Sequence, residues 1–462
     1  MYGRETGMGM TPEWFEKAKL GIFIHWGIYA VQGTKESWAF AYPSMSYVDY
    51  MKQLDGFTAK NYDPTYWAEL FKKAGAKYAV LTAKHHDGVA LWDTKCNDLS
   101  VVKRTPAGRD LVTPYCKAMR EAGIKVGFYY SHTDWSMDEH LSVLCDRTKD
   151  EIREMRQKKT AFVEMWSEVK NRTFEQANRS EDHVRSWETF MDFYFRQLHE
   201  VVHNFGPLDV FWGDGMFEMK GFDWQKKRAH DMIKAANPDT VISRLPEYSD
   251  VETPEVRIPC SRPSAGVWEY CTPINGSWGY RPSDNNYKSP LQVMRLFCDI
   301  LSLGGNMLLD IGPREDGTID ERQEEVLLRI GDFIRKNEEA IYESEQGLDR
   351  RFYGGGSVFS RDRKRLYLFV HEIPREGIMV KGVDTPYTKA SILSSGQELR
   401  IQEFFDGKYG CFWIHMTPDM VDPAMPTVVK VEFAEPCVPV DKWGMLWENE
   451  AAQAKEPSIL RN

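Results

Sequence analysis

The sequence has no apolar run that approaches the roughly 20 residues of a membrane-spanning helix. Its first ten residues are polar and glycine-rich, without the apolar core of a secretory signal peptide. We therefore expect no membrane partner and a cytoplasmic location for the chain as it stands. A secreted or periplasmic mature form whose leader has been removed is the alternative.

Closely spaced cysteines are also missing. None of the eight cysteines forms a C-x-x-C pair, and they are scattered at Cys96, Cys116, Cys145, Cys260, Cys271, Cys298, Cys411 and Cys437. This spacing argues against both a zinc site and a disulfide framework. We expect isolated thiols inside apolar segments.

Basic charge is not in excess, and no nucleotide-binding fingerprint is present. The chain carries 59 basic and 69 acidic residues, a net charge of −10, which disfavours nucleic acid or an anionic membrane as a partner. The glycines at the start, Gly3, Gly7 and Gly9, precede any expected strand and do not fit a dinucleotide motif.

What the sequence does contain is a series of short apolar runs that alternate with helical patterns. In one helical pattern Asp63 is suited to the N-cap and Pro64 to the first turn. Near-continuous apolar runs separated by helices predict a parallel sheet covered on both faces, and so many in series favour a closed (β/α) barrel over an open doubly wound sheet. The expected strands are 20–26, 78–82, 125–131, 208–212, 240–243, 266–270 and 306–311.

The pattern predicts two domains and a tail. Residues 1–345 read as a catalytic TIM-like (β/α) barrel, interrupted at about 137–190 by a long, charged helical region. That region is either a solvated insertion, which we favour, or a lid or assembly surface. Residues 346–450 have alternating strands and Pro/Gly turns typical of an all-β sandwich, and 451–462 read as a loose tail.

Polar and aromatic side chains gather where the expected strands end. In a barrel, catalytic groups come from the carboxyl ends of strands and the loops that follow. Flat aromatic walls combined with a few hydrogen-bonding groups suit a neutral, polyhydroxylated ligand. The residues in these positions are His25, His85, His86, Asp87, Tyr130, Asp134, Asp214, Arg244 and Glu269, with Trp26, Trp92, Trp135 and Trp212 beside them.

Asp214 is the strongest candidate for a nucleophile. It follows an apolar strand in the segment LDVFWGDG (208–215), in a glycine-rich turn beside Trp212. Its alternative role is to cap the next helix. If the polyhydroxylated ligand is a glycoside, Asp214 is positioned to attack its anomeric carbon. A glycosidase that retains configuration also needs a second carboxyl group about 5–5.5 Å away, which acts first as acid and then as base. Spacing alone leaves Glu247, Glu252, Glu255 and Glu269 open for that role.

The paired histidines do not predict a metal site. Adjacent residues of an extended strand point to opposite sides, so His85 and His86 cannot easily chelate one ion. We expect no metal and no cofactor, and hydrogen bonding to sugar hydroxyls instead.

Several segments together resemble the α-L-fucosidases of glycoside hydrolase family 29. They lie in family order along the barrel region: GIFIHWGIYAV (21–31), YAVLTAKHHDGVALW (78–92), IKVGFYYSHTDW (124–135), LDVFWGDG (208–215), WEYCTPINGSWGY (268–280) and GGNMLLDIGPREDGTI (304–319). The resemblance implies a distorted (β/α) barrel, a C-terminal β-sandwich, no metal, and hydrolysis by double displacement with retention.

The resemblance also assigns roles to individual residues. Asp214 matches the family nucleophile, and Arg244 matches the arginine near the acid/base loop. Glu255 is favoured as the acid/base, with Glu269 next. The residues that match the fucose-binding shell are His25, His85, His86, Tyr130 and Trp212, with Trp92 in the same segment as the paired histidines.

Two features depart from the family pattern. Glu and Trp usually follow the first strand directly in sequence, whereas here Glu36 and Trp38 are separated by Ser37. Trp38 is kept as a substrate-binding candidate. The charged region at 137–190 is also unusual, and its position suggests that it reshapes the leaving-group side of the cleft.

The expected function is therefore release of α-L-fucose from fucosylated oligosaccharides or glycoconjugates through a covalent fucosyl-enzyme intermediate. Two alternatives are a fucose-binding protein that has lost its chemistry and a related retaining glycosidase acting on another sugar, such as an α-L-galactoside. A homo-oligomer is possible.

Overall fold

The computed structural model describes residues 11–170, 180–217, 221–263, 266–372, 374–403 and 411–439. The chain divides after Tyr342 into two compact units. The expected tail at 451–462 lies outside the described residues. None of the helices in these ranges has both the length and the apolar composition that a membrane span requires.

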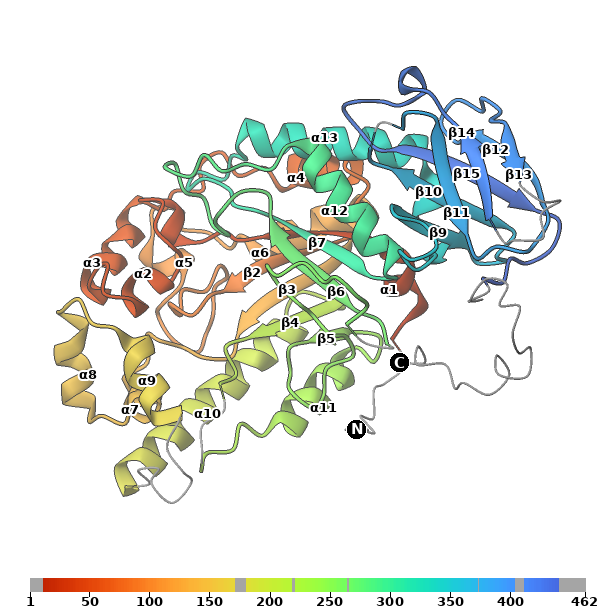
Figure 1. The fold of residues 1–462 in the computed structure, drawn as a ribbon. Helices are drawn as coiled ribbons and strands as arrows, with labels where there is room; N and C mark the ends of the chain where they lie inside the picture. Colours follow the sequence, from red (N-terminus) through yellow and green to blue (C-terminus); the bar gives the residue numbers. More distant parts are fainter. Residues whose placement is uncertain are drawn as a thin grey trace. The chain divides into compact units, whose positions relative to one another are not determined.

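The first unit is built on a curled sheet of seven parallel strands in the order β5-β4-β3-β2-β1-β7-β6 (Figure 1). All seven expected strands are present. Their bounds are β1 Leu20–Ile24, β2 Tyr78–Lys84, β3 Lys125–Ser131, β4 Val210–Asp214, β5 Val241–Ser243, β6 Glu269–Pro273 and β7 Asn306–Ile311. The distorted, TIM-like barrel predicted from the sequence is therefore confirmed as the fold class.

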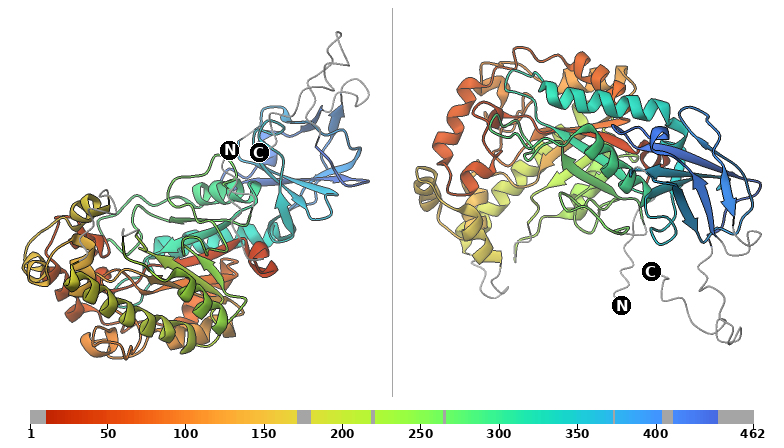
Figure 2. Two further views of the ribbon diagram at one scale, coloured as in Figure 1. Left: turned by 90° about the horizontal axis from the view of Figure 1, so that it is seen from below. Right: turned by 45° about the horizontal axis from the view of Figure 1, so that its top comes forward.

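Helices surround the outside of this sheet (Figures 1 and 2). In α4 the Asp63 side chain accepts hydrogen bonds from the Thr65 and Tyr66 amides, and Pro64 is the first helical residue, as predicted. The longer helices are α4 Pro64–Lys73, α6 Val112–Glu121, α10 Glu181–His203, α11 Lys226–Ala236, α12 Pro290–Ser302 and α13 Glu321–Lys336. Shorter ones are α1 Glu13–Ala18, η1 Ile28–Ala30, α2 Trp38–Ala41, α3 Tyr47–Met51, η2 Lys52–Gly56, α5 Val101–Arg104 and α14 Glu338–Ile341.

The sheet is not closed by a regular eighth strand. Instead, the segment Val251–Val256 bridges its two edges: Val251 pairs with Ser243 beyond one edge, and Glu252 pairs with Trp268 beyond the other. Val251 also contributes to the apolar cluster inside the barrel, beside Phe23, Tyr129 and Trp212. Closure through this irregular segment is the distortion of the barrel.

The charged region at 137–190 forms three short helices before α10, namely α7 Asp138–Cys145, α8 Lys149–Arg156 and α9 Phe162–Lys170. Its middle, residues 171–179, lies outside the described residues. Helix α7 is not a solvated helix as expected, because every residue from His140 to Cys145 is buried. Helix α8 has the expected charged surface and begins with a capping box of Thr148 and Glu151.

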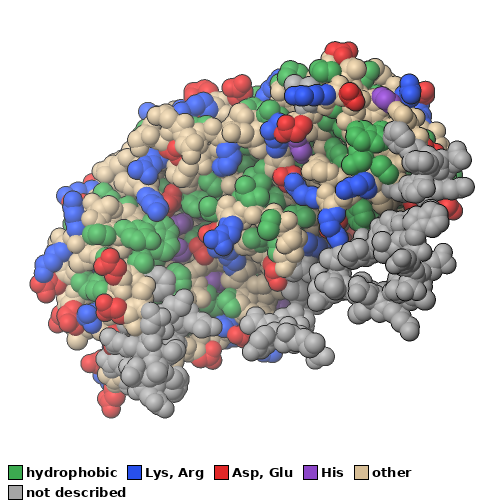
Figure 3. All heavy atoms as spheres, in the orientation of Figure 1, with side chains coloured by type: hydrophobic (Ala, Val, Ile, Leu, Met, Phe, Trp, Pro, Cys, Tyr) green, Lys and Arg blue, Asp and Glu red, His purple; other side chains and the backbone are tan. Residues whose placement is uncertain are grey.

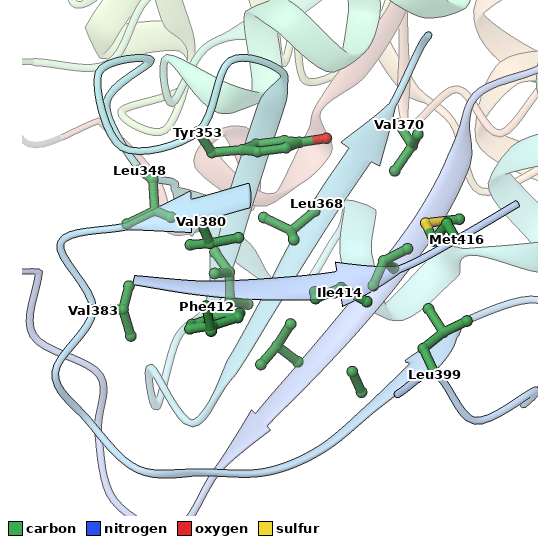
Figure 4. Packing of buried hydrophobic residues seen from close by; sticks show 14 of the residues in the cluster. Leu348, Tyr353, Leu368, Val370, Val380, Val383, Leu399, Phe412, Ile414 and Met416 are labelled. Atoms are coloured by element: carbon green, nitrogen blue, oxygen red, sulfur yellow. The ribbon is translucent and has the colours of Figure 1, made fainter. Parts of the chain in front are cut away.

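The second unit consists of two antiparallel sheets with strand orders β12-β15-β10-β9-β8 and β11-β14-β13. Alternate residues of both sheets, such as Leu368, Val380 and Ile414, form one buried apolar cluster (Figure 4). The strands are β8 Ser344–Gln346, β9 Gly356–Ser360, β10 Arg365–Val370, β11 Gly377–Lys381, β12 Tyr387–Ile392, β13 Ile401–Glu403, β14 Cys411–His415 and β15 Thr427–Phe433, with η5 at Pro418–Met420.

Truncating this second core should destabilise the unit. Leu368 is fully buried on the central strand β10, so Leu368→Ala should lower the free energy of unfolding by about 3 kcal/mol through lost burial and the cavity left behind. Denaturant titration, with unfolding monitored through hydrogen exchange of the β10 amides, measures this loss. Met379→Ala, at a side chain that is 37% exposed, is the control and should change the free energy by less than about 0.5 kcal/mol. Equal effects would contradict this description of the core.

Candidate active site

A pocket of about 240 Å³ opens where the carboxyl ends of the barrel strands meet. This volume is below the roughly 300–1,000 Å³ of pockets for drug-sized ligands, so it suits one small ring. On the face shown in Figure 3, histidine side chains are visible in a recess between hydrophobic and basic ones. The pocket is lined by Phe23, His25, Glu36, Trp38, His85, His86, Tyr129, Trp212, Asp214, Phe217, Arg244, Glu255 and Trp278.

Asp214 is the last residue of β4, and its carboxylate is held from three sides. The Tyr129 hydroxyl donates to Oδ2 over 3.0 Å, Arg244 Nη1 donates to Oδ1 over 3.3 Å, and His86 Nε2 lies 3.6 Å from Oδ2. The next residue, Gly215, has a φ of +73°, and a Cβ there would lie 2.7 Å from Thr133. The glycine in the Trp-Gly-Asp-Gly turn is thus needed to place Asp214.

Arg244 connects Asp214 to a second carboxylate. Its guanidinium donates through Nη1 to Asp214 and through Nη2 to Glu255. The guanidinium carbon lies 4.4 Å from the centre of the Trp212 ring, so the aromatic face supports the cation between the two carboxylates. Glu255 belongs to the irregular segment that bridges the sheet edges, where it pairs with Cys271.

The three histidines of the pocket are each fixed through Nδ1. His25 hydrogen-bonds to Asp310, His85 to Ser37 and His86 to Ser131, all over 2.6 Å.

Burial lowers the pKa of His25 and His85 well below the ordinary value and that of His86 to about 3. All three rings are therefore neutral at neutral pH. Each keeps Nε2 as the ring nitrogen available to a ligand.

Glu36 and Trp38 both line the pocket, although Ser37 separates them in sequence. Glu36 accepts a hydrogen bond of 2.7 Å from the Gly279 amide, and burial raises its pKa to about 7. Trp38 packs edge-on against Trp135 and His86, with ring centroids 5.2 and 5.7 Å apart.

Glu269 does not line the pocket. Strand β6 begins at Glu269, three residues later than the sequence suggests, so this carboxyl lies at the amino end of the strand rather than at its carboxyl end. It is 1% exposed and accepts hydrogen bonds from the Tyr78 hydroxyl and, over 3.1 Å, from Trp212 Nε1. Burial raises its pKa to about 7. It therefore fixes the Trp212 ring through the indole N–H at the ring edge.

Two further candidates lie away from the pocket. Side chains alternate along β3, so Tyr129 faces the barrel interior while Tyr130 faces outward, where its hydroxyl donates to Gln197 of α10. Tyr130 also lies under the ammonium group of Lys84, 4.6 Å from the ring centre. Trp92 is buried, and its Nε1 donates to Glu200 of α10 over 2.9 Å. Both assignments to the sugar-binding shell are corrected here.

The pocket also contains residues that the sequence argument did not select: Phe23, Tyr129, Phe217 and Trp278. Tyr129 could have been found from strand pairing, because it lies directly opposite Trp212 in the register of β3 and β4. Paired residues of neighbouring strands point to the same face of a sheet.

One stretch of α10 has the spacing of a metal-binding motif. His199, Glu200 and His203 have the H-E-x-x-H spacing of metalloproteases, a pattern that the sequence argument missed. On α10 the Glu200 carboxylate is occupied by Trp92 Nε1, Thr94 Oγ1 and the Lys95 amide. Across the described residues, no three histidine, cysteine or acidic side chains gather closely enough to hold a metal ion.

Glu269 should make stability depend on pH. In the folded protein this carboxyl keeps its proton up to about pH 7, whereas the ordinary value is 4.5. The unfolded state therefore loses the proton first, and the free energy of unfolding falls as pH rises from 4.5 to 7, by about 3 kcal/mol in all. Glu269→Gln removes this titration.

The measurement is the free energy of unfolding of wild type and Glu269→Gln at several pH values. The variant should gain about 3 kcal/mol relative to wild type between pH 4.5 and 7. The exposed Glu252 provides the control substitution, Glu252→Gln. A difference between Glu269→Gln and wild type that stays constant with pH would contradict the assignment.

Comparison with known proteins agrees with this geometry. The α-L-fucosidase family model matches residues 5–339. The tissue α-L-fucosidases of Rattus norvegicus and Homo sapiens are each 31% identical to the chain over 367 and 369 residues, covering 72% of it and 70% of each relative.

Solved structures are similar over nearly the whole length. α-L-Fucosidase isoenzyme 1 from Paenibacillus thiaminolyticus has a TM-score of 0.78 and 30% identity, covering 92% of this chain and 98% of that one. An α-fucosidase from Thermotoga maritima has a TM-score of 0.69 and 28% identity, covering 91% and 97%. The chain therefore belongs to the α-L-fucosidases of glycoside hydrolase family 29.

Proposed function

We propose that the chain releases α-L-fucose from fucosylated oligosaccharides or glycoconjugates by double displacement, with Asp214 as nucleophile and Glu255 as acid/base. The observation that carries the proposal is the single guanidinium of Arg244, which donates to both carboxylates in one pocket. Carboxylates that share one donor group lie close together, as retention requires (about 5–5.5 Å between the carboxyl groups).

In the first step an oxygen of Asp214 attacks C1 of fucose as the bond from C1 to the glycosidic oxygen breaks. Glu255 gives its proton to that oxygen, and a covalent fucosyl ester forms on Asp214. Glu255 then takes a proton from water as the water oxygen attacks C1 and frees Asp214.

Access supports Glu255 over Glu269 as the proton donor. The Glu255 side chain lines the pocket and is 41% exposed, so a glycosidic oxygen can reach it. Glu269 is 1% exposed, and its two oxygens accept hydrogen bonds from Tyr78 and Trp212. A carboxyl group without access to the substrate cannot transfer a proton to it.

Recognition of fucose rests on the neutral histidines and the aromatic walls. Nε2 of His25, His85 and His86 offers hydrogen bonds to sugar hydroxyls without adding charge. Trp212 and Trp278 offer apolar surface to the ring and its C5 methyl group. The related α-fucosidase of Thermotoga maritima has been solved in complex with fucose and with a mechanism based inhibitor.

Removing the nucleophile should abolish turnover without abolishing binding. Asp214→Gly should lower kcat for fucose release from a mixed pool of fucosylated oligosaccharides by about 10³-fold or more, while fucose still binds. Added azide can occupy the space of the lost carboxylate and attack C1 from the same face. Rescue should therefore yield β-L-fucosyl azide, identified by NMR. A near-normal rate, or an α-configured product, would overturn the role of Asp214.

The loss of rate on removing the acid/base should depend on the leaving group. Glu255→Gln should slow cleavage of fucosyl disaccharides by about 10²–10⁴-fold, and 4-nitrophenyl fucoside less, because nitrophenolate leaves without protonation. Azide attacking the fucosyl ester from the opposite face should give α-L-fucosyl azide. Glu269→Gln is the matched comparison and should change the rates for both substrates by the same factor. The reverse pattern would assign the acid/base role to Glu269.

A further inference from the structure

The segment after Glu255 exposes two large aliphatic side chains. Val256 is 62% exposed and Ile258 is 57% exposed. Among the large hydrophobic side chains in the described ranges, only Val438, at 64%, is more exposed. These two side chains follow Glu255 by one and three positions in the chain, and each leaves more than half of its surface exposed.

The backbone conformation at position 256 is unfavourable for valine. The stability of the fold therefore does not explain why an exposed valine is found there. Val256 has a φ of +60°, and the Arg257 amide donates to the Glu255 carbonyl over 2.5 Å, which forms a three-residue turn. Of the described non-glycine residues with positive φ, Val256 alone is β-branched. Glycine would adopt this conformation without strain.

The surrounding structure holds the turn in place. The Tyr270 hydroxyl donates to the Val256 carbonyl over 2.9 Å, and the Val256 amide donates to the Cys271 carbonyl over 3.2 Å. Strained residues persist where their surroundings impose the conformation, and they cluster at ligand sites. Because its side chain favours neither the turn nor the core, a contact outside the folded chain accounts best for valine here.

The pocket leaves only one place for the second ring of a substrate. A pocket of about 240 Å³ that holds fucose has no room for the next sugar, which must lie outside the rim. Proton transfer requires Glu255 to touch the glycosidic oxygen, and the atoms beyond that oxygen belong to the leaving group. Val256 and Ile258 do not line the pocket but directly follow Glu255 in the chain, and this closeness to the proton donor puts them within reach of the leaving group.

We propose, resting on the function proposed above, that Val256 and Ile258 form the contact for the leaving-group sugar, whose apolar C–H face covers them. This contact makes the segment after the acid/base residue a specificity-determining element. It favours a leaving group with a ring over a small one, because only a ring can cover both side chains.

The test compares two substrates that differ only beyond the scissile bond. One is the fucosyl disaccharide that wild type cleaves fastest, and the other is α-L-fucosyl fluoride, whose single-atom leaving group cannot reach either side chain. Val256→Thr and Ile258→Thr keep β-branching while replacing apolar surface. Each should lower kcat/KM for the disaccharide about 4-fold and leave that for the fluoride unchanged.

The control is Val438→Thr, the same substitution at a similarly exposed side chain of the second unit. It should change neither rate. A second variant, Val256→Gly, should retain or raise Tm, because it relieves the strained turn, and should still lose disaccharide activity.

Three outcomes would overturn the proposal. Unchanged disaccharide rates in both threonine variants would exclude the contact. Equal losses on both substrates would show instead that the turn acts by positioning Glu255. A wild type that releases fucose from neither substrate would overturn the proposed function and this contact with it, whereas the first two outcomes, in which wild type is active on both substrates, would refute the contact alone.

Discussion

The active site depends on one cation placed between two carboxylates. Without Arg244, Asp214 and Glu255 would repel each other in a partly buried pocket. The guanidinium offsets that repulsion, and it is itself supported by the face of Trp212. The Nε1–H of Trp212 donates a hydrogen bond to Glu269, and Glu269 also accepts a hydrogen bond from the Tyr78 hydroxyl. A continuous set of contacts thus runs from the barrel interior to the two carboxylates proposed to be catalytic, and a change at Glu269 or Tyr78 would move them.

The irregular closure of the barrel places the second carboxylate. Regular strands supply His25, His85, Asp214 and Arg244 from their carboxyl ends, as in any barrel of this class. The segment Val251–Val256 pairs with both sheet edges through isolated bridges and carries Glu255 up to the pocket. A regular strand in this position would direct its side chains alternately inward and outward, and it could not form the turn at Val256.

The sequence predicts the sheet, the barrel class and most of the pocket, because apolar runs and strand-end polar residues are local signals. Strand β3 is buried on both faces, so the sequence does not show which of two neighbouring side chains points into the barrel. The sequence argument therefore selects Tyr130, although Tyr129 is the residue that faces the pocket. The sequence also predicts the start of β6 three residues too early. This error places Glu269 at the carboxyl end of its strand instead of the amino end. Access to solvent and to substrate depends on contacts between distant segments, which no local pattern contains.

The anchoring and burial of the three pocket histidines keep these rings uncharged. Nδ1 of each ring is engaged by Asp310, Ser37 or Ser131, and burial opposes protonation of all three rings. The shape of the sugar's hydroxyl arrangement is then recognised in the same way in a neutral fluid and in an acidified one. A pocket built in this way recognises the sugar through the shape of its walls and through uncharged hydrogen-bonding rings, so a change of ambient pH does not require this recognition to be rebuilt.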